Sequence, residues 1–366
     1  MLRILCMMLV VFLVSCGGDA NQTWEFTPEN PVPVKFGDPY VLLASDGRYY
    51  MYGTGGGAVD GFSAYSSDDL KNWKHEGQVY HGNREGSWNV ANFWAPEVYE
   101  RNGKYYMFFS ADWKHNPGQE LENFRIGVAV ADSPTGPFTD LTGYPLFDPG
   151  YPVIDANVLF EEEKAYLYYS RVCYKHPVES EIADWARDEG LYDEIEESWV
   201  YGVVLSPGMD TVTGDPVLLL RPPVRMDNDQ AEWESRSVTS GEVNRRWTEG
   251  SFIFREQDTY YMMYSANYFG GEHYAVGYAT SNHPLGPFHK ASNNPVLEKN
   301  TDRGGEVSGT GHNSITWSKD GREMYCVYHG RTTATGHERV VFIDHMFIDE
   351  DGLLHVDGPT VSKELK

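Results

Sequence analysis

Basic residues are scarce in this 366-residue chain, which has 29 lysines and arginines against 54 aspartates and glutamates. The formal net charge of -25 leaves little positive surface for a phosphate backbone or an anionic lipid headgroup. The charge balance therefore argues against a nucleic-acid-binding protein and against adsorption to acidic membranes. It fits a soluble protein with a neutral or cationic ligand, without identifying that ligand.

Cysteine is also rare, with four in the whole chain. Cys6 and Cys16 lie in the N-terminal apolar segment, whereas Cys173 and Cys326 lie in aromatic runs that resemble strands. Export would permit a disulfide between the last two, but their spacing alone cannot pair them. We expect two buried free thiols.

The one marked hydrophobic run is "MLRILCMMLVVFLVSC", residues 1–16, which is too short to span a bilayer as a mature helix and is sized for a secretory signal. Its ending "LVSC" resembles the bacterial lipobox, in which Cys16 would be lipidated, and residues 17–23 would form a short tether. An ordinary signal peptide with a chance cysteine is the alternative. We expect an exported lipoprotein, on the outer membrane facing the periplasm or on the cell surface, with the lipid as its only membrane attachment. Unchanged membrane fractionation of a Cys16→Ser variant would contradict this.

Aromatic residues are abundant, at 14% of the chain, with 25 tyrosines and 10 tryptophans. Aromatic richness favours β-strands. The 37 glycines and 20 prolines are scattered between the aromatic runs instead of being gathered in a linker, as expected of turns between many short strands.

One phrase recurs five times along the chain: a short apolar strand, a polar or acidic turn, then a strand rich in Tyr, Phe and Met. The copies are "DPYVLLASDGRYYMYGTG" from Asp38, "APEVYERNGKYYMFFSA" from Ala95, "DANVLFEEEKAYLYYSR" from Asp155, "EGSFIFREQDTYYMMYSAN" from Glu249 and "HNSITWSKDGREMYCVYHGR" from His312. Turns such as "SDG" and "RNG" are hairpin signals. Further strand-sized runs follow each copy, giving about four strands per unit, which is the content of a propeller blade. We predict an all-β fold, a five-bladed β-propeller, as one domain over residues 24–366.

The interval between the third and fourth copies is the longest, so it must contain insertions. Residues 174–200 are acidic and are expected to form a helix or lid, and residues 221–247 are expected to form further loop. Long loops in compact domains are often functional, although a plain surface loop is the alternative for both.

Acidic residues recur at the head of the repeat. This position of the repeat is occupied by Asp38, Glu97, Asp155 and Glu249, and by His312 in the fifth copy. The inner strands of a propeller would bring these side chains together in one funnel along its axis. Strand-capping is the alternative role for any single one. Clustered carboxylates push one another's pKa values apart, which gives one site both an acid and a base. Two such carboxylates are the equipment of a glycosidase.

The motifs "FGDPYVL", "WAPEV", "IDANVLF", "EGSFIF" and "GTGHNS" together resemble those of glycoside hydrolase family 43, in that family's order and over nearly the whole mature chain. The resemblance implies a five-bladed propeller enzyme that inverts the anomeric configuration. It further implies that Asp38 is the general base, Glu249 the general acid, and Asp155 the residue that tunes and orients the acid.

The same resemblance assigns supporting residues. Trp94 would form part of the sugar-binding wall, and Arg331 in "YHGRT" would contact the sugar and the catalytic carboxylates. His312 resembles the axial histidine near a metal ion, often Ca²⁺, held through water. The glutamate of the family motif that matches Glu97 is more often structural than catalytic, so a structural role is expected for Glu97. No organic cofactor is expected.

The resemblance favours an exo-acting α-L-arabinofuranosidase on plant arabinan or arabinoxylan. The chain stops after the fifth blade, without the β-sandwich appended to many β-xylosidases of the family, which shifts the expectation toward arabinose. A β-xylosidase, an endo-arabinanase and a galactan-directed hydrolase remain open. Two alternatives come from other classes: a non-catalytic sugar-binding propeller and a retaining, sialidase-like propeller. The second is disfavoured because "SSDDLKNW", which faintly resembles the Asp-box of sialidases, occurs only once.

Overall fold

The computed structural model describes residues 26–173 and 178–362. The expected signal peptide 1–16 with Cys16, and the tether 17–23, lie outside these described residues. Within them, none of the helices has the length and hydrophobicity needed to cross a membrane.

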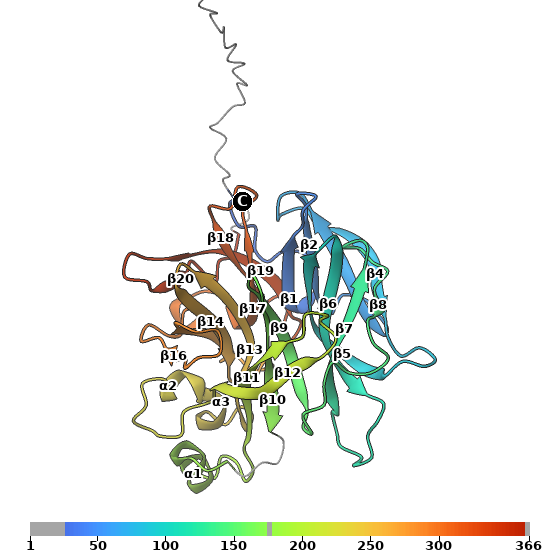
Figure 1. Cartoon of the computed structure of the whole chain (residues 1–366). Coiled ribbons are helices and arrows are strands. Elements are labelled where there is room, and N and C mark those ends of the chain that lie inside the picture. Colours follow the sequence, from blue (N-terminus) through green and yellow to red (C-terminus); the bar gives the residue numbers. More distant parts are fainter. Residues whose placement is uncertain (1–25, 174–177, 363–366) are drawn as a thin grey trace, which may run out of the picture.

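Within the described residues, twenty strands form five antiparallel groups of four in chain order (Figure 1), and a short parallel pairing of β11 with β13 joins the third and fourth groups. Blade 1 contains β1 (Phe36–Leu43), β2 (Tyr49–Gly55), β3 (Gly61–Ser67) and β4 (Lys74–His81). Blade 2 contains β5 (Asn89–Arg101), β6 (Lys104–Trp113), β7 (Phe124–Ala131) and β8 (Thr139–Asp140). Blade 3 contains β9 (Val153–Phe160), β10 (Ala165–Cys173), β11 (Glu196–Leu205) and β12 (Val212–Leu220). Blade 4 contains β13 (Arg245–Glu256), β14 (Thr259–Ala266), β15 (Ala275–Ser281) and β16 (His289–Lys290), and blade 5 contains β17 (Val307–Trp317), β18 (Met324–Thr332), β19 (Val340–Ile348) and β20 (Leu354–Val356).

The first strands of the blades form the inner ring. β1 contacts β5, β5 contacts β9, β9 contacts β13, β13 contacts β17, and β17 contacts β1. The five-bladed propeller expected from the repeats is therefore confirmed. Each repeated phrase corresponds to the inner strand of a blade and the strand that pairs with it.

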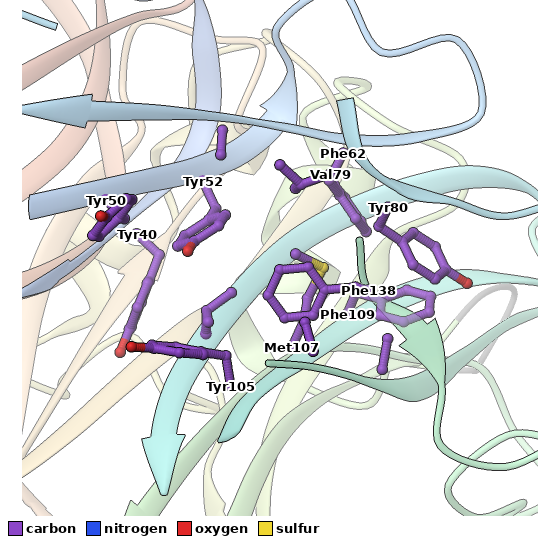
Figure 2. Close-up of a cluster of buried hydrophobic side chains, with 14 of the residues drawn as sticks. Tyr40, Tyr50, Tyr52, Phe62, Val79, Tyr80, Tyr105, Met107, Phe109 and Phe138 are labelled. Atoms are coloured by element: carbon purple, nitrogen blue, oxygen red, sulfur yellow. The ribbon is translucent and has the colours of Figure 1, made fainter. Parts of the chain in front are cut away.

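An apolar layer separates each blade from the next. Figure 2 shows the layer between blades 1 and 2, where Tyr40, Tyr52 and Phe62 of blade 1 pack against Met107 and Phe109 of blade 2. Four further clusters fill the equivalent spaces between the other neighbouring blades. Burial of this many aromatic rings supplies the main stabilisation of the propeller, which explains the aromatic composition.

Buried tyrosine hydroxyls tie neighbouring blades together. Tyr52 of β2 donates a hydrogen bond to the carbonyl of Pro134 (2.5 Å), and Tyr168 of β10 donates to that of Pro284 (2.8 Å). The two prolines begin the related segments "PTGPF" and "PLGPF". This repeat therefore has a structural cause, because each copy accepts a hydroxyl from the preceding blade.

The insertions between blades 3 and 4 carry most of the helical structure. Helix α1 (Glu181–Asp188) begins at Ser180, whose hydroxyl accepts the Ala183 amide, and it confirms the helix expected in residues 174–200. Helices α2 (Ala231–Glu234) and α3 (Arg236–Thr239) lie in the second insertion, and η1 (Thr301–Arg303) precedes β17. Figure 1 shows α1, α2 and α3 gathered on one side of the propeller, and apolar residues of the two insertions pack against each other.

The cysteine prediction is confirmed: Cys173 and Cys326 are buried free thiols.

The two ends of the described chain meet on blade 5. Val32 pairs with Val341 of β19, next to the short outer strand β20. The buried Asn30 side chain donates to the carbonyl of Ile343 and to Asp344, both at 3.0 Å, and accepts the Ile343 amide at 2.9 Å. The Asn30 side chain thus makes to the Ile343 backbone the two hydrogen bonds that a neighbouring strand would make, and in this way it closes the ring of blades.

We predict that Asn30→Ala destabilises the whole propeller. The change leaves the Ile343 amide and carbonyl buried without their partner, which costs about 1–3 kcal/mol for each unsatisfied group. Thermal unfolding should shift down by several degrees. The control is Glu29→Ala, which removes only an exposed ion pair with Lys71 and should shift unfolding little; equal shifts for both variants would contradict the closure role.

Candidate active site

Each inner strand is interrupted at the same level by a residue with positive φ. These residues are Asp38 (52°), Ala95 (45°), Asp155 (60°), Gly250 (56°) and His312 (48°). Pairing with the second strand of the blade shifts at each of these points, as in a β-bulge. A bulge re-aims the neighbouring side chains, and a non-glycine residue in this conformation is strained. The fold therefore accepts strain in four of the five blades, with a glycine in the remaining one, in order to direct side chains into the central funnel.

The amides at this level bond across blades to side chains of the second strands. The bonds run from Ala95 to the Thr54 hydroxyl (2.9 Å), from Asp155 to Ser110 (3.0 Å), from His312 to Ser265 (2.7 Å) and from Asp38 to Nδ1 of His329 (3.1 Å). At the remaining position, the Gly250 amide donates to Asp155 Oδ2 (3.1 Å), which also accepts the Ser170 hydroxyl (3.2 Å). These bonds fix the height of every bulge relative to its neighbour.

A cavity of about 300 Å³ opens at this level. Its lining includes Asp38, Asp155, Glu249, Trp94 and His312. The structure thus brings together five of the residues that the sequence singled out, from all five blades. Glycine is required at position 250, because a Cβ there would lie 3.0 Å from the His312 ring and the backbone φ is positive.

Asp38 is held as an anion. Arg339 Nη1 lies 2.9 Å from its Oδ1, and the Thr54 hydroxyl donates to Oδ2 at 2.6 Å. Burial alone would raise the pKa of this carboxyl, but Arg339, the nearby His312 and the Thr54 hydrogen bond outweigh burial, so its pKa lies well below the ordinary value. Asp38 is therefore ionised at any ordinary working pH.

Glu249 is held as a neutral acid. Burial raises its pKa well above the ordinary value, and the negative charge of Asp155 raises it further. Repulsion from Asp155 was expected from sequence; burial is the larger cause, and Glu249 is only 4% exposed. The Tyr274 hydroxyl donates a hydrogen bond to its Oε1 at 2.9 Å.

Asp155 lies between these two states. Burial raises its pKa, while the Gly250 amide and the Ser170 hydroxyl both bond to its Oδ2 and stabilise the charged form. Because Glu249 lacks such amide donors, we place the shared proton of this pair on Glu249. Asp155 thus lines the cavity beside Glu249, and its role in tuning the acid stays a prediction.

Glu97 does not join the other carboxylates, which corrects the expected convergence. The bulge residue of blade 2 is Ala95, and Glu97 lies one pleat further along β5, at the level of Asn157 below the cavity. There it bonds to the Tyr99 hydroxyl and to Asn157 (2.9 Å). Burial raises its pKa to about 8. Its neutral, hydrogen-bonded state agrees with the structural role that the resemblance implied.

The arginine that pairs with Asp38 at the cavity is Arg339, where the resemblance pointed to Arg331. Arg331 donates to the carbonyls of Phe269 (2.8 Å) and His337 (3.2 Å). It therefore supports the backbone behind the cavity, while Arg339 pairs with Asp38 directly. The sequence offered no sign of this, because Arg339 lies in a loop, "GHERV", outside the repeated phrase.

Aromatic walls surround the carboxylates. Trp94 lines the cavity as expected and packs on Phe124, with ring centroids 4.3 Å apart. Phe269, Tyr274 and Trp247 also line the cavity; none of them belongs to the motifs that indicated the site, and Trp247 falls within the stretch 221–247 that was expected to be loop. Trp247 lies on β13, the inner strand of blade 4, so the end of the stretch expected to be loop is strand that lines the cavity.

His312 faces Asp38, with Nδ1 3.3 Å from the carboxylate oxygen. Among the described residues, no three His, Cys, Asp or Glu side chains are grouped so that they could ligate a metal directly. An ion held through water does not need such a group. Calcium near His312 therefore stays a prediction, and no step below depends on it.

The site offers one ionised and one protonated carboxyl in a cavity with aromatic walls. That combination suits general acid and general base catalysis on a sugar, since the anion can accept a proton from water and the neutral acid can donate one to a leaving oxygen.

Comparison with known proteins identifies the family. The profile of "Glycosyl hydrolases family 43" matches residues 28–354. A beta-D-galactofuranosidase of Aspergillus niger is 28% identical over 94% of this chain and 91% of its own length, and a xylosidase/arabinosidase of Thermoclostridium stercorarium is 27% identical over 90% of this chain and 64% of its own. The crystal structure of a thermostable family-43 glycoside hydrolase superposes with a TM-score of 0.75 and 36% identity, over 92% of this chain and 98% of that one. The chain belongs to glycosyl hydrolase family 43 and is an inverting glycoside hydrolase.

Proposed function

We propose that this enzyme is an exo-acting α-L-arabinofuranosidase that removes side chains from plant arabinan or arabinoxylan. The observation that carries the proposal is the size of the cavity. At about 300 Å³, it is at the lower limit of ordinary ligand pockets, as expected for a site that encloses a terminal sugar instead of a continuous chain.

The surroundings of the cavity support exo action. A larger cleft of about 860 Å³ adjoins it and shares Glu122 and Arg245 in its lining. A polymer in this cleft could present its terminal sugar to the cavity. Trp247 and Arg245, at the start of β13 directly after the second insertion, line one side of the cavity, which supports a pocket with a wall on that side.

The names of relatives support a furanose or pentose substrate. They include an extracellular exo-alpha-(1->5)-L-arabinofuranosidase of Streptomyces chartreusis, 24% identical over 83% of this chain. Two others are described as xylosidase/arabinosidase in Bacteroides ovatus and Humicola insolens. That double name favours β-xylosidase as the second candidate.

In the proposed mechanism, Asp38 accepts a proton from the water that attacks the anomeric carbon. Glu249 protonates the leaving oxygen at the same time, so the configuration inverts. Asp155 keeps the pKa of Glu249 raised by its charge and is held in place by the Gly250 amide. Trp94 and Arg339 would contact the bound sugar.

A non-catalytic sugar-binding propeller is disfavoured by the cost of the site. Asp38, Asp155 and Glu249 are all buried or nearly so, and buried carboxyls are costly unless they are paired or used. A binding module would gain nothing from a neutral Glu249 buried beside the charged Asp38 and Asp155.

Release of free sugar from a panel of arabinan, arabinoxylan, xylan and galactan tests the substrate. We expect arabinose from the first two, and only monosaccharide among the early products of linear arabinan. A ladder of oligosaccharides would refute exo action, and xylose from xylan without arabinose release would favour β-xylosidase.

Two variants test the roles of the carboxyls. Glu249→Gln cannot donate a proton, so its rate on polysaccharide should fall by about 10²–10⁴-fold, with a much smaller loss on an aryl glycoside that has a good leaving group. Asp38→Asn should lose activity on both substrates, because water must be activated whatever leaves. Equal losses for Glu249→Gln on both substrates would show that another group is the acid.

Arg339→Met tests the ionisation of Asp38. Because Arg339 lowers the pKa of Asp38, its removal should raise that pKa and move the acidic limb of the pH–rate profile to higher pH. The basic limb, set by ionisation of Glu249, should move little. Arg339→Lys keeps the charge and is the control; if both variants retain the wild-type acidic limb, Arg339 does not set the charge of the base.

A further inference from the structure

His329 differs from the residues that occupy the same position in the other blades. The bulge amides of three blades bond to the hydroxyls of Thr54, Ser110 and Ser265, but the Asp38 amide bonds to an imidazole nitrogen. His329 is fully buried on β18. The exception therefore occurs at the one bulge that carries the proposed general base.

The hydrogen bond fixes the state of this histidine. Nδ1 can accept the Asp38 amide only when it carries no proton, so the ring is neutral with its hydrogen on Nε2. Burial lowers the pKa of His329 well below the ordinary value, and the charge of Arg339 lowers it further. His329 therefore acts on Asp38 as an acceptor for its backbone amide, and the 3.5 Å approach to the carboxylate is not an ion pair.

The imidazole ring also stacks on Tyr274. The ring centroids are 5.6 Å apart and the planes differ by 16°. Gly311, which pairs with His329 across the strands, bounds the tyrosine ring: a Cβ at Gly311 would lie 2.2 Å from Tyr274 Cε1. The tyrosine ring thus has little freedom to shift.

Tyr274 in turn holds the proposed acid. Its hydroxyl donates to Glu249 Oε1 at 2.9 Å, and its side chain is buried. An oxygen that accepts this bond is favoured as the carbonyl oxygen of the neutral acid, which leaves the proton on Oε2. The bond therefore selects which oxygen of Glu249 can protonate the leaving group.

These contacts form a continuous chain from base to acid: Asp38, His329, Tyr274 and Glu249. We infer that His329 and Tyr274 are positioning residues that jointly fix the separation and orientation of the two catalytic carboxyls. An inverting enzyme needs such control, because a water molecule must fit between base and sugar while the acid reaches the leaving oxygen. The inference rests on the roles proposed for Asp38 and Glu249.

The first test is at His329. His329→Phe keeps a ring but removes the acceptor for the Asp38 amide. The value of kcat should fall by about 10²-fold, as for a misplaced catalytic group, with a small change in KM. The loss should be the same on polysaccharide and on an activated aryl glycoside. His329→Asn restores an acceptor near the Nδ1 position and should recover most of kcat on the aryl glycoside. Equal kcat values for the two variants would overturn the role of the acceptor.

The second test is at Tyr274. Tyr274→Phe keeps the ring stacked on His329 but removes the hydroxyl, so it should slow only substrates with poor leaving groups. It should also move the basic limb of the pH–rate profile to higher pH, because the hydroxyl lowers the pKa of Glu249. Tyr274→Leu also removes the stack. It should therefore additionally slow the aryl glycoside, through His329 and Asp38; if it matches Tyr274→Phe on that substrate, the two carboxyls are not linked through these rings.

Ser265→Ala is the matched control for stability, because it deletes the equivalent bond to the His312 amide. Its thermal shift gives the cost of losing one such bond; its activity is not compared, because Ser265 pairs with Glu249 across the strands and His312 lies 3.3 Å from Asp38. Should His329→Phe fail to fold, the Tyr274 pair still decides the inference. Asp38→Asn and Glu249→Gln, made with His329 and Tyr274 intact, test the catalytic roles separately, so failure of those roles is distinguishable from failure of the link.

Discussion

The active site depends on one electrostatic constraint: the buried carboxylate of Asp38 must remain charged. Burial opposes that charge, and the Arg339 ion pair with the Thr54 hydrogen bond overcomes the opposition. The residues that serve it come from blades 1 and 5, which are the first and last in the chain. The chemistry therefore requires a closed ring, and the closure through Asn30 matters for function as well as for stability.

Burial raises the pKa of Glu249 just as it opposes the charge of Asp38, but in the described structure no cation pairs with Glu249 as Arg339 pairs with Asp38, so the net outcome is the opposite. Burial and the nearby Asp155 keep its proton in place. One cavity thus contains carboxyls in two protonation states, separated by their partners and not by their chemical type. The fivefold bulge makes this possible, because it directs side chains from separate blades to one level at the expense of local strain.

The repeat in the sequence predicted the blades because hairpin pairing and alternation are local properties of each phrase. It was less reliable on phase. The second phrase begins at Ala95, which aligns with Asp38 and occupies the bulge of blade 2, whereas Glu97 lies two residues further along β5 and so does not share the position of Asp38. A carboxyl that was expected in the funnel lies one level below it, bonded to Tyr99 and Asn157.

The sequence by itself determined the all-β architecture, the number of blades, the free thiols and the cavity residues Asp38, Asp155, Glu249, Trp94 and His312, because each belongs to a repeated or recognisable local motif. Only the tertiary structure decided that Arg339 and not Arg331 pairs with the base, and that His329 and Tyr274 connect base to acid. These contacts join residues up to 301 positions apart in the chain. No local pattern encodes them, since they arise only when blade 5 packs against blade 1 and blade 4.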